Sequence, residues 1–369
     1  MTGLPRRLLR FAALFSILLT AVLCLAEEPA DSGLSYEVKF LLDSEKVLGT
    51  DHLLKDEIKE LFGIADDSED YPDEYEEIYV LYLETADRAF IGKNWINRIR
   101  WRGSKKKPLE RTYKKRYPDI GETRDDILAA LEKAQEDGFS LGGDYEAQID
   151  WGYSKMALSF SQKTKEKAPE GFTSLSKMNT GDAVAYMSAA MPEKEKAAAP
   201  IQKAQKTDTI HVFRIEGVFR GSGTDTDVTI EVWPYFDRET RETAYITELS
   251  FEAEKSDFQT VADTRMGLED YLNQKGILLC EDSLKTTLIL KAHIRTYPEK
   301  VGFTLPAALT KIGGSAFAGC PAESVLVPDE TKQIAGDAFA GAEDLIVIGA
   351  LNSAADTFAN QNAYSFIPE

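Results

Sequence analysis

The feature that most constrains this chain is a basic segment whose charged residues alternate with apolar ones. Between residues 88 and 116 the sequence has twelve Lys or Arg residues and one acid, Glu110, although the whole chain has a formal net charge of -19. Within this segment, the run 96–102 has arginines at alternate positions, with Ile99 and Trp101 between them. Successive side chains of a β-strand point to opposite faces, so this run predicts a strand with one guanidinium face and one apolar face.

Such a row of guanidinium groups, formed by Arg98, Arg100 and Arg102, suits an anion with several closely spaced charges. Each guanidinium offers forked donors that match the oxygens of a phosphate group. The alternative interpretation is a solvated edge strand that its charges protect from aggregation.

The first residues have the pattern of an export signal. Arg6, Arg7 and Arg10 precede an apolar run at 11–25, and Ala26 follows as a small residue before two glutamates. We therefore predict a signal peptide at 1–26, and a secreted or cell-surface protein without a membrane span once the signal is removed. Removal takes away three bases and leaves 40 bases (43 − 3) against 62 acids, a charge near -22. This acidity argues against general nucleic-acid binding.

Cysteines and histidines are sparse in the predicted mature chain. Cys280 and Cys320 both lie in apolar surroundings, so we expect two buried thiols rather than a disulfide. The three histidines lack the spacing of a zinc site. Without a disulfide framework the fold must rest on hydrophobic cores, for which 43% hydrophobic residues suffice.

Alternating patterns predict eight strands with few helices between them, which favours an antiparallel sheet or a closed barrel. Helices are expected near 51–62, 123–136 and 261–274. The eight acids of 66–77 predict a mobile loop, and 163–207 predicts a helical insertion, with a helix near 183–190, followed by a flexible connector. The eight expected strands are Tyr36–Leu42, Glu77–Leu83, Ile96–Arg102, Leu109–Arg116, Lys155–Gln162, Ile210–Phe219, Asp227–Trp233 and Tyr245–Glu252.

The last part of the chain, 303–369, repeats itself with a period of 22 residues. Ala316-Phe317-Ala318-Gly319 recurs as Ala338-Phe339-Ala340-Gly341, and a degenerate third copy follows. One short strand and one buried Phe in each repeat predict a short solenoid. The segment resembles the BspA-type leucine-rich repeat, which implies a module that contacts a protein partner.

Taken together, the charged faces of the strands divide by sign. Positive charge is concentrated in the third and fourth strands, whereas acids such as Glu231 and Glu248 lie in the last two. If the sheet closes, cations and carboxylates line one polar interior. Such an interior can hold a polyphosphate through Lys and Arg, and a divalent metal through carboxylates.

Several of these segments are similar to the CYTH domain of the triphosphate tunnel metalloenzymes. The resemblance implies an α+β fold, an eight-stranded antiparallel tunnel barrel with flanking helices, whose tunnel binds triphosphate groups, usually with Mg²⁺ or Mn²⁺. It places this domain at 34–295, interrupted by 163–207. The segments that carry it are Tyr36–Phe40, Tyr82–Asp87, Trp95–Arg102, Thr112–Arg116 and Ile246–Glu252.

The resemblance also assigns roles to individual residues. Two positions depart from the family pattern, because Ser35 and Ser250 stand where its first and last strands have glutamates. Serine is a poor ligand for Mg²⁺, so the two serines weaken the case for catalysis more than the case for binding. The phosphate-binding positions are Lys39, Arg98, Arg100, Arg102, Lys114 (or Lys115) and Arg214, and the metal-binding positions are Glu37, Glu231 and Glu248.

Three functions follow from these observations. The first is an exported or surface protein whose tunnel binds polyphosphate or triphosphate anions with weak or no catalysis. The second is a phosphohydrolase of triphosphate or polyphosphate that depends on a divalent metal. The third is a structural or adhesion protein with a hydrated polar interior and no phosphate ligand.

Overall fold

The computed structural model describes residues 33–369, except 104–107, 222–224, 238–239, 255 and 283–284. The predicted signal peptide at 1–26 lies outside the described residues. Among those described, no helix combines the length and apolar character needed to cross a membrane.

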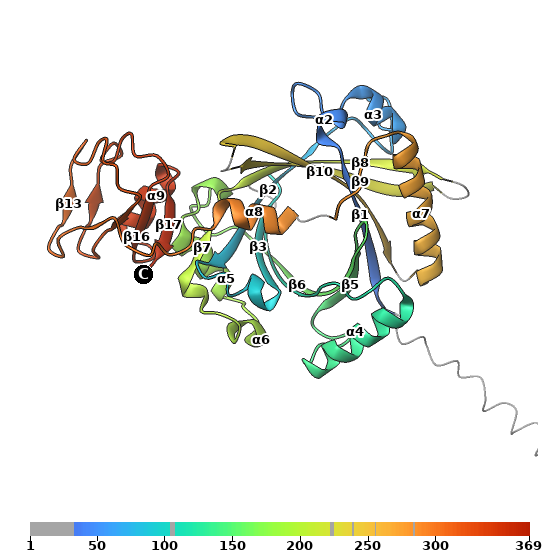
Figure 1. Ribbon diagram of the computed structural model, residues 1–369, viewed down its shortest axis with the longest axis horizontal. Coiled ribbons are helices and arrows are strands. Elements are labelled where there is room, and N and C mark those ends of the chain that lie inside the picture. Colours follow the sequence, from blue (N-terminus) through green and yellow to red (C-terminus); the bar gives the residue numbers. More distant parts are fainter. Residues whose placement is uncertain (1–32, 104–107, 222–224, 238–239, 255, 283–284) are drawn as a thin grey trace, which may run out of the picture.

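A closed barrel of nine strands forms the main body of the molecule (Figure 1). The ring runs β10-β9-β8-β2-β3-β4-β6-β5-β1, and pairing of β1 with β10 closes it. The ring strands are β1 (Ser35–Leu42), β2 (Glu76–Thr85), β3 (Trp95–Trp101), β4 (Leu109–Tyr117), β5 (Glu146–Trp151), β6 (Met156–Glu166), β8 (Ile210–Arg220), β9 (Asp225–Asp237) and β10 (Glu242–Glu254).

The expected antiparallel barrel of eight strands is therefore corrected to nine strands, one pair of which is parallel. All eight expected strands are present, and β5 is the additional one, paired antiparallel with β6 and parallel with β1. A ring with an odd number of strands cannot alternate direction throughout, so at least one neighbouring pair must be parallel. The short β5 supplies that pair by filling the gap between β6 and β1.

The outward face of the barrel is apolar and is covered by helices. Val38, Phe40, Ile99 and Trp101 belong to the large outer core, and α4 and α7 pack against β6 and β1. Thr123 caps α4 in a capping box with Asp126, which confirms the expected start of that helix. The helix expected at 51–62 is shorter, because α3 begins only at Asp56. The helices in this part are α2 (Ser44–Val47), α3 (Asp56–Leu61), η1 (Ile91–Lys93), α4 (Arg124–Glu136) and α7 (Phe258–Gln274).

The insertion is ordered, which corrects the expectation of a flexible connector. Its helix α5 covers the outer face of the barrel, where Tyr113 and the buried Arg111 of β4 donate hydrogen bonds to the backbone carbonyls of Met187 and Tyr186. The following strand β7 pairs with β2. The elements of the insertion are η2 (Leu175–Lys177), α5 (Thr180–Ser188), α6 (Glu193–Lys196), η3 (Ile201–Lys203) and β7 (Ala204–Lys206).

In the tail, short parallel strands repeat at the expected period. Phe303 pairs with Val325, and Ser324 with Ile346, so each partner lies 22 residues further along the chain (325 − 303, 346 − 324). Phe317 stacks on Phe339 with ring centroids 5.0 Å apart. The 22-residue unit is thus a structural one, and its assignment to the leucine-rich repeats stays a prediction. The tail elements are β12 (Phe303–Thr304), β13 (Lys311–Ile312), β14 (Ser324–Leu326), β15 (Gln333–Ile334), β16 (Ile346–Gly349), α9 (Ala354–Gln361) and β17 (Ser365–Pro368).

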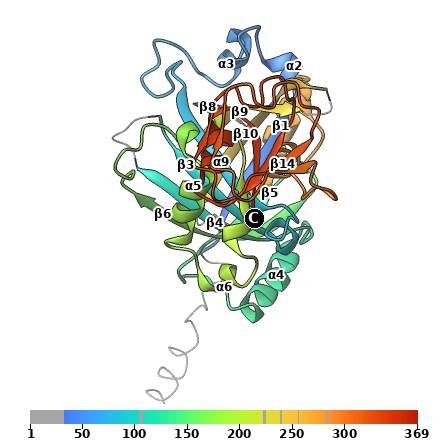
Figure 2. The ribbon, with the colours of Figure 1, turned by 90° about the vertical axis from the view of Figure 1, so that its left-hand side faces the viewer.

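The tail docks on the insertion, which Figure 2 shows from the side of the tail. The fully buried carboxylate of Asp356, on α9, accepts hydrogen bonds from the backbone N–H groups of Thr180 and Gly181 at the start of α5, at 3.0 and 2.8 Å. Two elements lie between α7 and the tail, β11 (Leu278–Leu279) and α8 (Lys285–His293). The two cysteines among the described residues form no disulfide, but Cys280 is exposed and Cys320 half-buried, so the expectation of two buried thiols is wrong.

Candidate anion-binding tunnel

The alternation of side chains along β3 and β4 places their charged residues inside the barrel. Arg100 lies opposite Glu110 and Arg98 opposite Thr112, whereas Ile99 and Trp101 face the outer core. On β4, Lys114 points into the barrel, whereas the next residue, Lys115, points outward. The ammonium of Lys115 donates to the carbonyl of Lys93 and lies over the rings of Trp95 and Tyr117.

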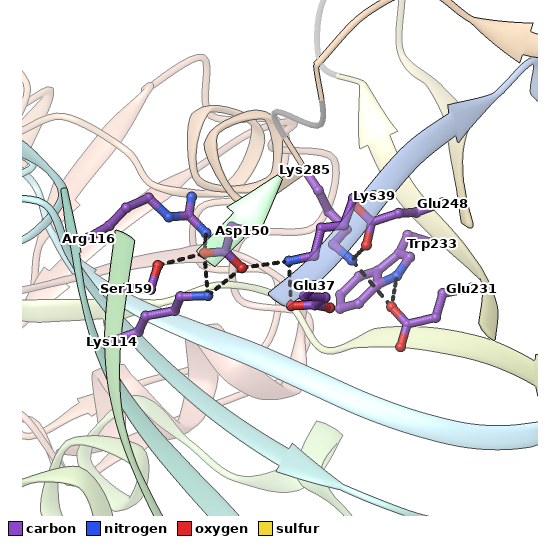
Figure 3. A network of polar contacts seen from close by, with 10 residues as sticks. All are labelled: Glu37, Lys39, Lys114, Arg116, Asp150, Ser159, Glu231, Trp233, Glu248 and Lys285. Atoms are coloured by element: carbon purple, nitrogen blue, oxygen red, sulfur yellow. Dashed lines mark hydrogen bonds and ion pairs between the residues drawn. The ribbon is translucent and has the colours of Figure 1, made fainter. Parts of the chain in front are cut away.

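Asp150 of β5 is the centre of a cluster of cations (Figure 3). Its carboxylate oxygens lie 3.0 Å from the ammonium of Lys39, 2.7 Å from that of Lys114 and 3.4 Å from the guanidinium of Arg116. The hydroxyl of Ser159 donates a further hydrogen bond of 2.5 Å. The side chain of Asp150 is only 9% exposed, so one buried carboxylate is shared by three cations from β1 and β4.

These contacts shift the pKa values of the cluster. Burial opposes ionisation of Asp150, but Lys114, Lys39 and Arg116 hold the pKa of its carboxyl well below the usual range. Burial also acts against Lys39, yet the charges of Asp150 and Glu37 raise the pKa of its ammonium. For Lys114 burial prevails, and Lys39 and Arg116 add to it, so the pKa falls to about 8. The cluster as a whole has three cations, Lys39, Lys114 and Arg116, against the carboxylates of Asp150 and Glu37.

A second cationic group lies on β3 and β4. Arg100 is 2.7 Å and Arg98 is 3.9 Å from the carboxylate of Glu110, whose side chain is 6% exposed. Burial and the charge of Arg98 lower the pKa of Arg100. Within the described part of the chain, the buried Nε atoms of Arg98, Arg100, Arg116 and Arg214 have no hydrogen-bond partner.

Arg214 lies in a further group of charges, which includes Arg102. Arg102 pairs with Glu76, and the guanidinium of Arg214 lies 3.5 Å from Glu76 and 3.2 Å from Glu216. A cavity of about 250 Å³ adjoins Arg214 and is lined in addition by Asp70, Pro72 and Glu74 from the acidic loop. These two arginines are thus balanced by carboxylates, unlike those around Asp150 and Glu110.

Glu231 and Glu248 share a cation from outside the barrel strands. The two carboxylates lie opposite each other on β9 and β10, and the ammonium of Lys285, the first residue of α8, lies 3.2 Å from Glu231 and 2.8 Å from Glu248 (Figure 3). The indole N–H of Trp233 also donates to Glu231 at 2.8 Å. Burial alone would raise the pKa of both carboxyl groups, but the charge of Lys285 outweighs it and lowers the pKa of Glu248. Lys285 and the hydrogen bond from Trp233 together lower the pKa of Glu231 to about 2.

The residues expected to bind Mg²⁺ or Mn²⁺ do not form a metal site in this arrangement. Glu37 pairs with Lys39 at 2.8 Å, and the other two acids pair with Lys285. In the described ranges, no three His, Cys, Asp or Glu side chains are grouped so as to hold a metal ion. Ser35 donates to the carbonyl of Ala147 at 3.3 Å, and Ser250 lies opposite Lys39.

The structure thus brings most of the predicted site residues together and adds others that the sequence did not reveal. Arg102, just beyond the end of β3, pairs with Glu76, and Lys114 rather than Lys115 is the inward lysine. Asp150 and Lys285 were not predicted. The sequence does contain a signal for a strand at Asp150, because Ala147, Ile149 and Trp151 alternate with polar residues. The strand is only six residues long, however, so the alternating pattern is short. The inward-facing predicted residues are Glu37, Lys39, Arg98, Arg100, Lys114, Arg214, Glu231 and Glu248.

No model of a known protein family matches the chain, and no curated protein matches it. Among solved structures, it is similar to a protein from Hippeastrum described as a candidate adenylyl cyclase with a dominant triphosphatase activity. The TM-score is 0.44 and the identity 11%, over 71% of this chain and 97% of that one. A candidate adenylate cyclase from Bacillus halodurans gives a TM-score of 0.34 and 15% identity, over 65% and 89% of the two chains.

Proposed function

We propose that the tunnel binds a compact polyanion, inorganic triphosphate or polyphosphate, with weak or no catalysis. The observation that carries this proposal is the surplus of buried positive charge. In the clusters around Asp150 and Glu110, five half-buried cations face three carboxylates; with the neighbouring Glu231, Glu248 and Lys285 the tunnel has six cations to five carboxylates, an excess of one charge (6 − 5). An anion that enters between the clusters would compensate this excess and accept from the unpartnered Nε atoms.

The resemblance to the CYTH domain supports the same ligand class. The positions that the family uses for phosphate are filled by Lys39, Arg98, Arg100 and Lys114, all of them buried or half-buried in the tunnel. Its metal positions are held in ion pairs instead, which favours binding over hydrolysis. Export through the signal at 1–26 and a protein partner for the repeats are further parts of this proposal.

Two adjacent residues of β4 give a matched test of the ligand. Lys114→Ala removes an inward cation, and Lys115→Ala removes an outward one. Titration calorimetry should show triphosphate binding to the wild type, much weaker sulfate binding, and unchanged binding to Lys115→Ala. For Lys114→Ala and Arg100→Ala the loss of one charge-assisted contact, about 1.5–3 kcal/mol, lowers the affinity about ten- to hundredfold. Equal affinities of the inward and outward variants would contradict a tunnel site.

Phosphate release separates binding from turnover. We expect triphosphate hydrolysis to stay feeble or absent with Mg²⁺ or Mn²⁺, because the expected metal ligands are engaged by lysines. Robust wild-type hydrolysis that Glu37→Gln abolishes would instead support the metal-dependent hydrolase.

A further inference from the structure

The pair Glu231 and Glu248 needs a positive charge in order to be stable. The two residues are direct cross-strand partners, and their inward-facing carboxylates are 18% and 4% exposed. Like charges directly opposite each other destabilise a sheet, and burial strengthens their repulsion. A cation between them removes this repulsion. In a metal-dependent tunnel a divalent ion would be the natural candidate for that cation.

Here the cation is the ammonium of Lys285, and its position is fixed by packing. The side chain is 14% exposed, and Nζ lies 4.0 Å from the centroid of the Trp233 ring. The rest of α8 is anchored inside the barrel, where Ile289 and Leu290 join a hydrophobic cluster with Val80, Tyr82 and other inward residues. Lys285 is therefore held by an aromatic face, two carboxylates and an apolar helix, unlike a mobile surface lysine.

We propose that Lys285 is a built-in cation that occupies the place of the divalent metal, so that the tunnel takes its polyanion free of metal. A divalent ion between Glu231 and Glu248 would lie against the ammonium of Lys285, and their repulsion excludes the ion as long as the lysine is in place. The inference rests on the proposed function for its ligand class. It adds a specificity, free triphosphate rather than the magnesium complex.

The experiment removes the charge of Lys285 and measures metal binding without any phosphate. Lys285→Met keeps much of the side-chain length, and Lys291→Met is a matched control on the same helix. Titration of purified protein with Mn²⁺, followed by electron paramagnetic resonance, should show no tunnel binding in the wild type or in Lys291→Met. Lys285→Met should gain affinity by about tenfold or more, the equivalent of one charge-assisted contact. Addition of Glu248→Gln to Lys285→Met should abolish the gain.

Two outcomes would overturn the inference. One is wild-type Mn²⁺ binding that Glu248→Gln abolishes, and the other is a folded Lys285→Met protein that gains no affinity. If Lys285→Met fails to fold, the wild type and its Glu248→Gln variant still decide through the first of these outcomes. Because none of these titrations contains phosphate, failure of triphosphate binding would remove the proposed function and leave this metal result intact.

The stated specificity has its own measurement. In calorimetry on the wild type, Mg²⁺ in excess over triphosphate should weaken the apparent binding of triphosphate. The reason is that Mg²⁺ competes with the protein for the free anion. Tighter binding in the presence of Mg²⁺ would contradict the specificity.

Discussion

Glu195, on α6, is a carboxyl group with no solvent exposure. Burial raises its pKa to about 8, and Asn97 offsets this shift only in part. Since the unfolded chain ionises this group near its ordinary value of 4.5, the folded state is favoured most below that pH. Its contribution is then lost progressively as the pH rises from 4.5 towards about 8.

Glu195→Gln should therefore raise the free energy of unfolding at pH 8 by about 1–3 kcal/mol and leave it nearly unchanged at pH 4.5. Urea unfolding at both pH values measures this difference. Glu193→Gln, on the same helix but exposed, should show no such gain. An equal response of the two variants at pH 8 would contradict the shifted pKa.

Asp150→Asn tests the balance of charge in the tunnel. Without the carboxylate, Lys39, Lys114 and Arg116 repel one another, and breaking a buried ion pair in this way costs about 3–5 kcal/mol. The melting temperature of the variant should be lower than that of the wild type. Triphosphate should raise it by more than it raises the melting temperature of the wild type, because the anion replaces the lost negative charge. The exposed Glu146→Gln on the same strand serves as control. A loss that triphosphate leaves unchanged would place the anion elsewhere.

The elements show how far the sequence leads and where it stops. The charged faces of β3 and β4 could be predicted because long alternating runs fix which side chains share a face. The short strand β5 could not be predicted in this way, because it lies between polar turns. Its parallel pairing with β1 also depends on closure of the ring. Lys285 was missed for a related reason, because nothing in the local pattern of α8 shows that the helix packs inside a barrel. Contacts between residues distant in sequence decided both cases.

The junction of α5 and α9 should be essential for holding the tail. Asp356→Ala leaves three backbone N–H groups without their acceptor, those of Thr180, Gly181 and Asn352. We expect a loss of about 3–5 kcal/mol and faster protease cleavage between the barrel and the tail. Asp337→Ala, an exposed tail residue that accepts from Ser315, is the control. Cleavage at the same rate in both variants would show that the tail is held by other contacts.

At the scale of the whole molecule, the outer core of the barrel and the core of the tail meet at a shared contact. Leu351 packs against both the barrel core and the tail core, and Arg295 and Arg241 pair with Asp344 and Glu343 of the tail. The tail has few repeats of its own, so these contacts supply stability that a short array lacks. A partner bound by the tail would therefore meet a surface fixed relative to the tunnel.

Closure of the ring also determines the order in which this protein can form during synthesis. The first strand, β1, pairs with β5, β10 and the short β11, all of which come later in the chain; Ser35, for example, lies opposite Gln148 of β5 and Glu254 of β10. Until β10 has been made, one edge of β1 stays unpaired, and such contacts between distant residues form slowly. The nascent chain thus presents an open strand edge for most of its elongation, and an unpaired edge is a site of aggregation.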